Sequence, residues 1–353
     1  MKLFILSVRF LEVCNLFKQH ISLYIFMVSL ILFSSCDVHQ WPDTPDTVKF
    51  HLELNYDTQM TQMNYVYQNN QVIAQGGDVT YVNALNSGTI RYIIRVYQNG
   101  YTSFINPSSA NSFIKEITLT RNLSQGYDYA TDIELPQGDY KIMVWSDLAE
   151  GADSPYFYNP QNFAEIKLMG TYRGNTNYRD AFRGTGDIRL VSDILANQPD
   201  TLSISMQRPL AKYEFITNDL KDFITKESVV DTEDYNVVFL YAGFMPNTYN
   251  MFSDSPTDSY SGVMTGSRLN VLNANEASLG FDYVFTGLQP TSILIQIGLY
   301  DNQQRQVALS EPINVPLKRG FHTILKGSFL MQQTSGGIYI KPEFDGNHNI
   351  INY

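Results

Sequence analysis

The sequence predicts an all-β protein, and three observations support that prediction. Short runs in which every second residue is apolar recur along the chain, and long stretches with the helical spacing of apolar residues are nearly absent. Aromatic residues make up 13% of the chain and are dominated by tyrosine, a residue type that favours strands. Many short strands separated by polar turns are typical of β-sandwiches.

The clearest strand pattern covers residues 48–56. Five residues alternate there with polar ones, namely Val48, Phe50, Leu52, Leu54 and Tyr56. This period of two predicts a strand with one buried face. Similar patterns predict further strands at residues 91–97, 113–119, 131–135, 140–145 and 201–206. Pro136 and Gly138 predict a turn between the strands at 131–135 and 140–145.

The second half of the chain carries the same kind of pattern. Strands are expected at residues 211–217, 237–242, 281–285, 293–300, 322–329 and 337–341. Residues 162–168 and 218–225 are expected to form a helical turn or two each. One strand pattern ends and another begins around Arg208. We therefore expect one β-sandwich domain at residues 48–207 and a second at residues 208–353.

The N-terminal segment has the layout of a secretory signal. Three basic residues stand against one acidic residue in the first 20 positions, and an apolar run follows at residues 21–33. This run is shorter than the about 20 residues that a membrane-spanning helix needs. Ser34, Ser35 and Cys36 then complete a motif that resembles the lipobox of bacterial lipoproteins. We expect a signal peptide at residues 1–35, cleaved between Ser35 and Cys36; the alternative is an ordinary signal peptide that ends near a cysteine.

The cysteine count agrees with lipidation. The chain has two cysteines, and Cys14 lies inside the expected signal peptide. Cys36 would then be the single cysteine of the mature chain, so it could form no intrachain disulfide. Lipid on Cys36 would explain this thiol, because more than one acyl chain gives stable anchoring. Two prolines and three acids at residues 37–47 predict an extended tether at residues 36–47.

The charge of the chain excludes several classes of partner. The net charge is −11, and the signal peptide contributes +2, so the mature chain is near −13. An acidic chain of this kind lacks the basic surface that binds nucleic acid. Anionic lipid would also repel it, so a link to the outer membrane would depend on the lipid at Cys36.

The sequence contains no recognisable catalytic, cofactor-binding or metal-binding signature, and no enzyme is expected. His39, His51, His322 and His348 are scattered, and neither a nucleophile elbow nor a phosphate-binding loop is present. The segment at residues 345–349 has oxygen ligands but lacks the alternating ligands and terminal Glu of a calcium loop, so we interpret it as a turn.

Several segments resemble the FimB/Mfa-type fimbrial anchor subunits of Bacteroidales bacteria. The matching segments follow the lipobox and continue through most of the mature chain, at residues 36–42, 135–145, 208–213, 315–323 and 327–330. The resemblance implies two tandem transthyretin-like β-sandwiches. It also implies a lipid-anchored, surface-exposed protein at the base of a fimbria, which joins stalk subunits to the outer membrane and serves cell adhesion.

The resemblance also implies how an anchor subunit differs from stalk and tip subunits of the fimbria. In stalk and tip subunits of such fimbriae, an arginine-specific protease removes the first strand, and a neighbour's strand fills the groove. This chain has no arginine between Cys36 and Arg91. The strand at residues 48–56 is therefore expected to stay in place, as an anchor or terminator requires. A C-terminal strand or tail at residues 337–353 is expected to contact a stalk subunit.

Two other functions stay open at this point. A surface lipoprotein of a different β-sandwich family could bind a glycan or a host surface, using Tyr156, Phe157 and Tyr158 as an exposed aromatic platform. A surface enzyme would need clustered carboxylates in a cleft, and no local pattern selects such a pair.

Overall fold

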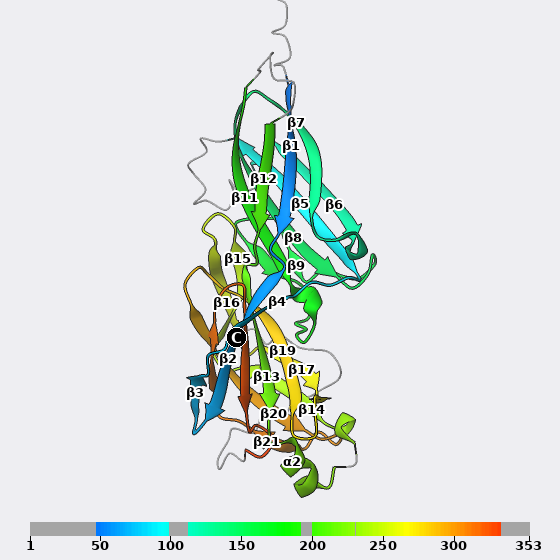
Figure 1. Ribbon diagram of the computed structural model, residues 1–353, viewed down its shortest axis with the longest axis vertical. Helices are drawn as coiled ribbons and strands as arrows, with labels where there is room; N and C mark the ends of the chain where they lie inside the picture. Colours follow the sequence, from blue (N-terminus) through cyan, green and yellow to red (C-terminus); the bar gives the residue numbers. More distant parts are fainter. Residues whose placement is uncertain (1–46, 99–111, 192–199, 230, 333–353) are drawn as a thin grey trace, which may run out of the picture. The chain divides into compact units, whose positions relative to one another are not determined.

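The computed structural model describes residues 47–98, 112–191, 200–229 and 231–332 (Figure 1). Several predictions lie outside these residues: the signal peptide, the cleavage site at Ser35 and Cys36, nearly all of the tether, the strand at 337–341 and the turn at 345–349. The described residues from Val48 onward cluster as one compact unit. Within the described residues, no helix is long and apolar enough to cross a membrane.

The first β-sandwich consists of two facing sheets, which confirms the all-β fold class. One sheet has the order β12-β1-β7, with β1 at Thr47–Tyr56, β7 at Tyr129–Pro136 and β12 at Asp200–Met206. The other has the order β11-β8-β5-β6, formed by β5 (Thr89–Gln98), β6 (Lys115–Asn122), β8 (Gly138–Ala149) and β11 (Ala181–Leu190). Their shared core includes Phe50, Leu52, Ile94, Val144 and Ile204.

The second β-sandwich also has two sheets. One follows the order β18-β19-β13-β23-β2-β3, with β4 also paired to β2; its members are β2 (Gln59–Gln68), β3 (Gln71–Ala74), β4 (Val79–Val82), β13 (Leu210–Thr217), β18 (Asn270–Val271), β19 (Ala277–Phe285) and β23 (Phe321–Gly327). The other contains β14 (Asn236–Tyr241), β17 (Met264–Arg268), β20 (Thr291–Tyr300), β21 (Gln306–Leu309) and β22 (Ile313–Leu317). Phe215, Phe239 and Leu325 lie in the core between them.

A smaller sheet covers the outer face of β5 and β8. It has the order β16-β15-β10-β9 and consists of β9 (Tyr158–Asn159), β10 (Ile166–Leu168), β15 (Phe244–Asn250) and β16 (Ser255–Ser261). Trp145 and Met143 of β8 pack there with Tyr158 and Tyr249. Because both of its faces are covered, β8 is an almost continuous buried run and does not alternate.

The predicted strands within the described residues are present, and one of the two expected helical turns is wrong. Residues 218–225 fall largely in α2 (Leu220–Glu227), whose buried face carries Leu220 and Phe223. Residues 162–168 instead make a short turn at Asn162, which accepts a hydrogen bond from the Ala164 amide, followed by strand β10. Strand β10 pairs with β15, which comes from the second half of the chain. The local pattern at residues 162–168 favours a helical turn, but it contains no information about this distant partner.

The hydrogen bonding divides the chain differently from the expected boundary. That boundary falls between β12 and β13, which do lie in different sheets. Strands β2, β3 and β4, however, precede the boundary and pair in the sheet of β13 and β23. Residues 59–82 therefore belong by pairing to the second sandwich, and the chain crosses between the sandwiches directly after β1.

Candidate functional site

Strand β1 lies in the middle of its sheet, between β12 and β7 (Figure 1). It runs parallel to β12, in a register from Phe50 opposite Asp200 to Tyr56 opposite Met206. A central strand uses the main-chain groups of both of its edges, so loss of β1 would expose two unpaired edges and a groove between them. The strand predicted at residues 48–56 thus occupies the place that an added strand would need.

The inner face of β1 is part of the sandwich core. Phe50 and Leu52 are fully buried, and Leu54 is 1% exposed. Val48 and Tyr56 are partly buried and pack against the same core. Complete burial of a side chain of this size stabilises the fold by about 1.5–3 kcal/mol, so the three central residues hold the strand strongly.

Tyr56 fixes the end of β1 within a cluster of rings. Its hydroxyl lies 2.5 Å from Ser146 Oγ on the facing sheet. Its ring makes contacts at 5.1–6.1 Å between centroids with Tyr92, Tyr127 and Phe182. Burial raises the pKa of Tyr56 well above its ordinary value. The hydroxyl therefore stays neutral and hydrogen-bonded, as a buried polar group must.

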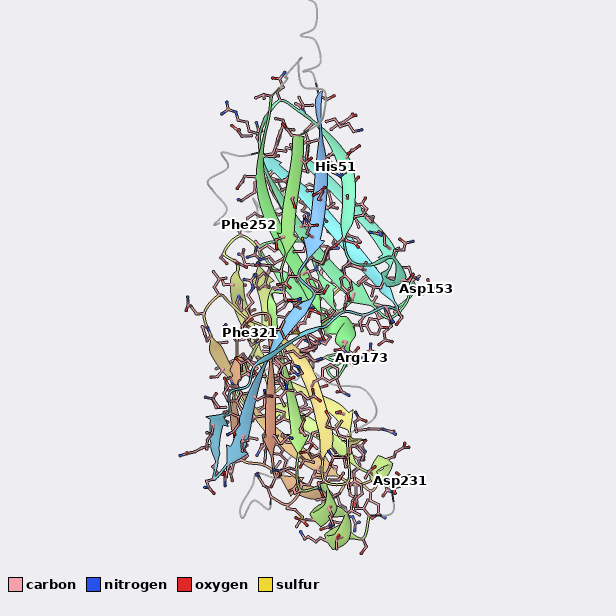
Figure 2. All side chains as sticks on the ribbon, in the orientation of Figure 1. His51, Asp153, Arg173, Asp231, Phe252 and Phe321 are labelled. Carbon is pink, nitrogen blue, oxygen red and sulfur yellow. The ribbon has the colours of Figure 1, made fainter. Side chains whose placement is uncertain are left out.

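The outer face of β1 is polar and held by weaker contacts. Asp132 of β7 accepts from Lys49 Nζ at 2.7 Å and lies 2.7 Å from His51 Nδ1, a residue labelled in Figure 2. The bonds from Lys49 and His51 lower the pKa of Asp132. Asn55 donates to Ser203 Oγ at 2.6 Å. Such exposed pairs contribute little to the free energy of unfolding. Their main effect is to fix the register of β1 against its neighbouring strands.

Arg208 holds the link between β1 and β2. Its guanidinium donates to the carbonyl oxygens of Asp57 at 3.0 Å, Gln59 at 2.8 Å, Thr58 at 3.3 Å and Asn83 at 2.8 Å. Arg208 is 3% exposed. We call this arrangement, together with Asp180, the Arg208 clamp. It ties the residues that directly follow β1 to the start of β13, far along the chain.

Asp180 balances the charge of the clamp. Arg208 Nε lies 2.8 and 3.0 Å from the two carboxylate oxygens of Asp180, which is 2% exposed. Burial raises the pKa of Asp180, and the Arg208 guanidinium opposes that effect. Phe182 stacks beneath Arg208, with 4.6 Å from the guanidinium carbon to the ring centroid. A charged pair buried in this way needs both members, because either one alone would be left unpaired.

A second buried charge lies beside the clamp. Lys212 of β13 is 6% exposed, and its Nζ donates to Asn177 Oδ1 at 3.0 Å. Tyr283 donates to the same oxygen at 2.9 Å and accepts from Asn83, a member of the clamp. Burial lowers the pKa of Lys212 to about 8. The segment around residues 177–180 therefore connects both cations to the same polar network.

The expected aromatic platform is not exposed. Tyr158 is fully buried and packs against Trp145, and its hydroxyl donates to the Arg179 carbonyl at 2.6 Å. Arg91 lies over the ring of Tyr156 at 4.0 Å. Arg173 likewise covers Phe157 at 5.1 Å. Packing and arginine stacking occupy these rings, so the structure does not support the alternative of a sugar platform at residues 156–158.

The two described histidines lie apart and serve local contacts. His51 is on the outer face of β1, whereas His322 of β23 is 4% exposed and lies 2.8 Å from the Tyr81 hydroxyl. Within the ranges that the structure describes, no group of three or more His, Cys, Asp or Glu is placed to hold a metal ion. The residues that sequence reasoning missed are Arg208, Asp180 and Asn83, which no local pattern connects.

The fold and the site define the class of protein: an all-β chain whose first described strand is the central strand of a sheet in the first sandwich. The chain belongs to DUF6562, a family of unknown function, which matches residues 44–352. No curated protein is similar enough in sequence to count as a relative.

Two solved structures illustrate what the fold resembles. The fimbrial anchor protein Mfa2 from Porphyromonas gingivalis is 10% identical, with 74% of this chain and 82% of that chain covered and a TM-score of 0.37. A fimbrial assembly protein from Parabacteroides distasonis is 10% identical, with 82% and 94% covered and a TM-score of 0.36. Both TM-scores are below 0.5.

Proposed function

We propose that this chain is an outer-membrane lipoprotein that anchors or terminates a fimbria. The observation that supports this most is the position of β1, which fills the central place between β12 and β7. A subunit that extends a fibre by strand addition must offer an empty groove to its neighbour. A subunit with a filled groove ends the fibre at that point.

The buried contacts of β1 resist its displacement. An incoming strand would have to replace the core packing of Phe50, Leu52 and Leu54 as well as the main-chain bonds to β12. It would also have to release the link that Arg208 holds at the carbonyls of Asp57 and Gln59. The clamp therefore acts on the same segment that strand addition would remove.

The proposed lipid on Cys36 would stay joined to this strand. No arginine lies between Cys36 and Arg91, so an arginine-specific protease has no site in the tether or in β1. About eleven residues separate Cys36 from Thr47, and an extended chain spans at most 3.3–3.6 Å per residue. The first sandwich would then be held within roughly 35–40 Å of its lipid.

The anchor role is tested by adding a cleavable site to the tether. In Asp46→Arg, an arginine-specific protease added to fimbriated cells should cut before β1, and the fimbriae should appear in the medium. The matched control is Asp46→Lys, which changes the charge equally but adds no site for this protease. Equal retention of fimbriae by both variants would contradict the anchor role.

The contact with the stalk is proposed at residues 337–353, which lie outside the described residues. A chain that lacks residues 333–353 should keep its membrane location and lose co-purification with the stalk subunit. Unchanged co-purification would rule out this contact while leaving the role of β1 untouched.

A further inference from the structure

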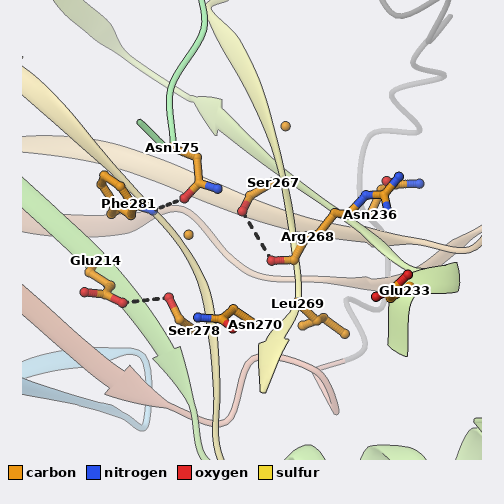
Figure 3. Close-up of a pocket in the computed structure, with 12 residues that line it drawn as sticks. Asn175, Glu214, Glu233, Asn236, Ser267, Arg268, Leu269, Asn270, Ser278 and Phe281 are labelled. Atoms are coloured by element: carbon orange, nitrogen blue, oxygen red, sulfur yellow. Dashed lines mark hydrogen bonds between the residues drawn. The ribbon is translucent and has the colours of Figure 1, made fainter. Parts of the chain in front are cut away.

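We propose that the second sandwich binds a neutral oligosaccharide in the groove between β17 and β19 (Figure 3). The groove has a volume of about 750 Å³ and is lined mostly by polar side chains. It lies where an edge strand of one sheet, β17, faces β19 of the other sheet. Ligand sites in proteins commonly have volumes of 300–1,000 Å³, so the groove is large enough for several sugar rings.

The backbone builds this groove through an irregularity in β19. The pairing of β13 with β19 shifts register between Phe215 and Ile216, opposite Gly280. Gly280 has a φ of 131°, and a Cβ there would lie 2.6 Å from Ser267 Oγ and 2.8 Å from the Phe239 ring. Only glycine fits this position without displacing its neighbours. The bulge thus sets the floor of the groove.

The loop at Asn175 closes one side of the groove. Its amide donates to the Phe281 carbonyl at 2.9 Å, and its side-chain oxygen accepts from the Phe281 amide at 3.2 Å. These paired bonds fix the loop against β19, and among the described residues the side-chain NH₂ group of Asn175 has no partner. Figure 3 shows Asn175 and Phe281 together at this side.

The opposite side presents polar groups that have no protein partner. Asn236 of β14 and Arg268 of β17 stand opposite each other in register, with Glu233 next to them. Within the described part of the chain, none of these three side chains makes a hydrogen bond or ion pair. Together they supply amide, guanidinium and carboxylate groups, which offer both donors and acceptors. Sugar hydroxyls need this mixture, because each hydroxyl both donates and accepts.

The charges in the groove favour a neutral ligand. Glu214 is already engaged, since it accepts from Ser278 Oγ at 2.6 Å and lies 3.4 Å from His322 Nε2. Glu233 and Arg268 offset each other, which leaves no excess of positive charge for a phosphate, a sulfate or an acidic sugar. The ring of Phe281 is half-buried and lies under Lys212 Nζ, 4.3 Å from the ring centroid, so it adds little apolar surface beside the polar groups. Such a site could give the protein an adhesive role that does not depend on the proposed anchoring.

The proposal is tested by titrating the full chain with tetra- to hexasaccharides of glucose, mannose, galactose and xylose. At least one neutral series should bind, and the variant Asn236→Ala/Arg268→Ala should bind at least about tenfold more weakly. The matched control is Arg305→Ala, since Arg305 is an exposed arginine of the same sandwich that pairs with Asp301 outside the groove. Thermal unfolding establishes that each variant is folded.

Three outcomes would overturn the proposal. The first is that no neutral oligosaccharide binds below about 10 mM. The second is that the double variant binds as the parent chain does. The third is that oligogalacturonates bind more tightly than every neutral series, because the site would then select acidic sugars. None of these outcomes bears on the position of β1 or on its lipid.

Discussion

Arg208 illustrates how one side chain can secure a whole strand. Its five donors reach four carbonyl oxygens and one carboxylate, and these lie in the β1–β2 link, at Asn83 and at Asp180. Lysine has one ammonium group and could not reach all of these acceptors at once. The residue therefore determines how the chain leaves the first sandwich.

Loss of the clamp should be costly. In Arg208→Ala, the buried carboxylate of Asp180 loses its partner and four carbonyl groups lose their donor. We expect the free energy of unfolding to fall by about 3–5 kcal/mol, the usual effect of removing one member of a buried pair. Denaturant unfolding measures this change. The control Arg305→Ala removes an exposed arginine and should cost below about 1 kcal/mol; equal effects of the two variants would contradict the clamp.

Burial of Lys212 should make the free energy of unfolding depend on pH, and the sign of this dependence follows from its pKa. Burial lowers its pKa to about 8 in the folded chain, against 10.5 for an ordinary lysine. Between these values the unfolded chain binds more protons, so the free energy of unfolding should rise with pH. Below pH 8 both states are protonated and the effect is absent. Above pH 10 the tyrosines oppose it, because their pKa values are raised on folding, for example to about 12 for Tyr81.

The expected gain from pH 8 to pH 10 is up to about 2 kcal/mol, since each pH unit contributes up to about 1.4 kcal/mol. Denaturant unfolding across this range measures it. In Lys212→Met the rise should disappear, because no buried amine remains to lose its proton. A variant that keeps the rise would show that another group titrates in this range.

At the scale of elements, the alternation at residues 48–56 predicted β1 correctly because β1 has one buried and one exposed face. The same rule fails for β11, which was not predicted. Gly184 and Gly186 interrupt its pattern, and a Cβ at Gly184 would lie 2.5 Å from Ile204 and 2.6 Å from Met206. The close approach of β12 requires glycine there, and a single sequence does not reveal that approach.

The crossing of the chain at β2 was equally hidden. Strand β2 pairs in parallel with β23, a partner more than 250 residues further along the chain. The residues of the clamp are likewise far apart. In the sequence, Arg208 marked a boundary between two strand patterns and opened one segment of the family resemblance, but nothing linked it to Asp180 or Asn83. Periodicity reports which face of a strand is buried, whereas pairing partners and convergent side chains depend on the whole fold.

The two faces of β1 should respond differently to substitution. Leu52→Ala removes a fully buried side chain and should lower the free energy of unfolding by about 2–5 kcal/mol. The neighbouring Glu53→Ala changes the outer face of the same strand and should stay within about 0.5 kcal/mol. Denaturant unfolding of both variants tests this. A small effect of Leu52→Ala would mean that β1 is not held in the core in solution.

At the scale of the whole molecule, the proposed anchor depends on the connection between lipid, tether and first sandwich. An acidic chain of net charge −11 gains nothing from anionic lipid headgroups, so membrane attachment would depend on the acyl chains.

Replacement of Cys36, the proposed lipidation site, should release the protein. In Cys36→Ala, we expect loss of labelling by radioactive palmitate and transfer of the chain from the membrane fraction to the soluble fraction. Folding should be unaffected, because Cys36 precedes the first strand and the described core contains no cysteine. Membrane attachment that persists in Cys36→Ala would show that another contact holds the protein.

As the base of a fimbria, the working protein should keep its first described strand joined to the proposed lipid. The most direct measurement is the N-terminus and intact mass of the chain extracted from fimbriated cells. We expect a mature chain that begins at an acylated Cys36 and retains residues 47–56. A mature chain that begins after Tyr56 would contradict it, because β1 would then have been removed and its groove opened to another subunit.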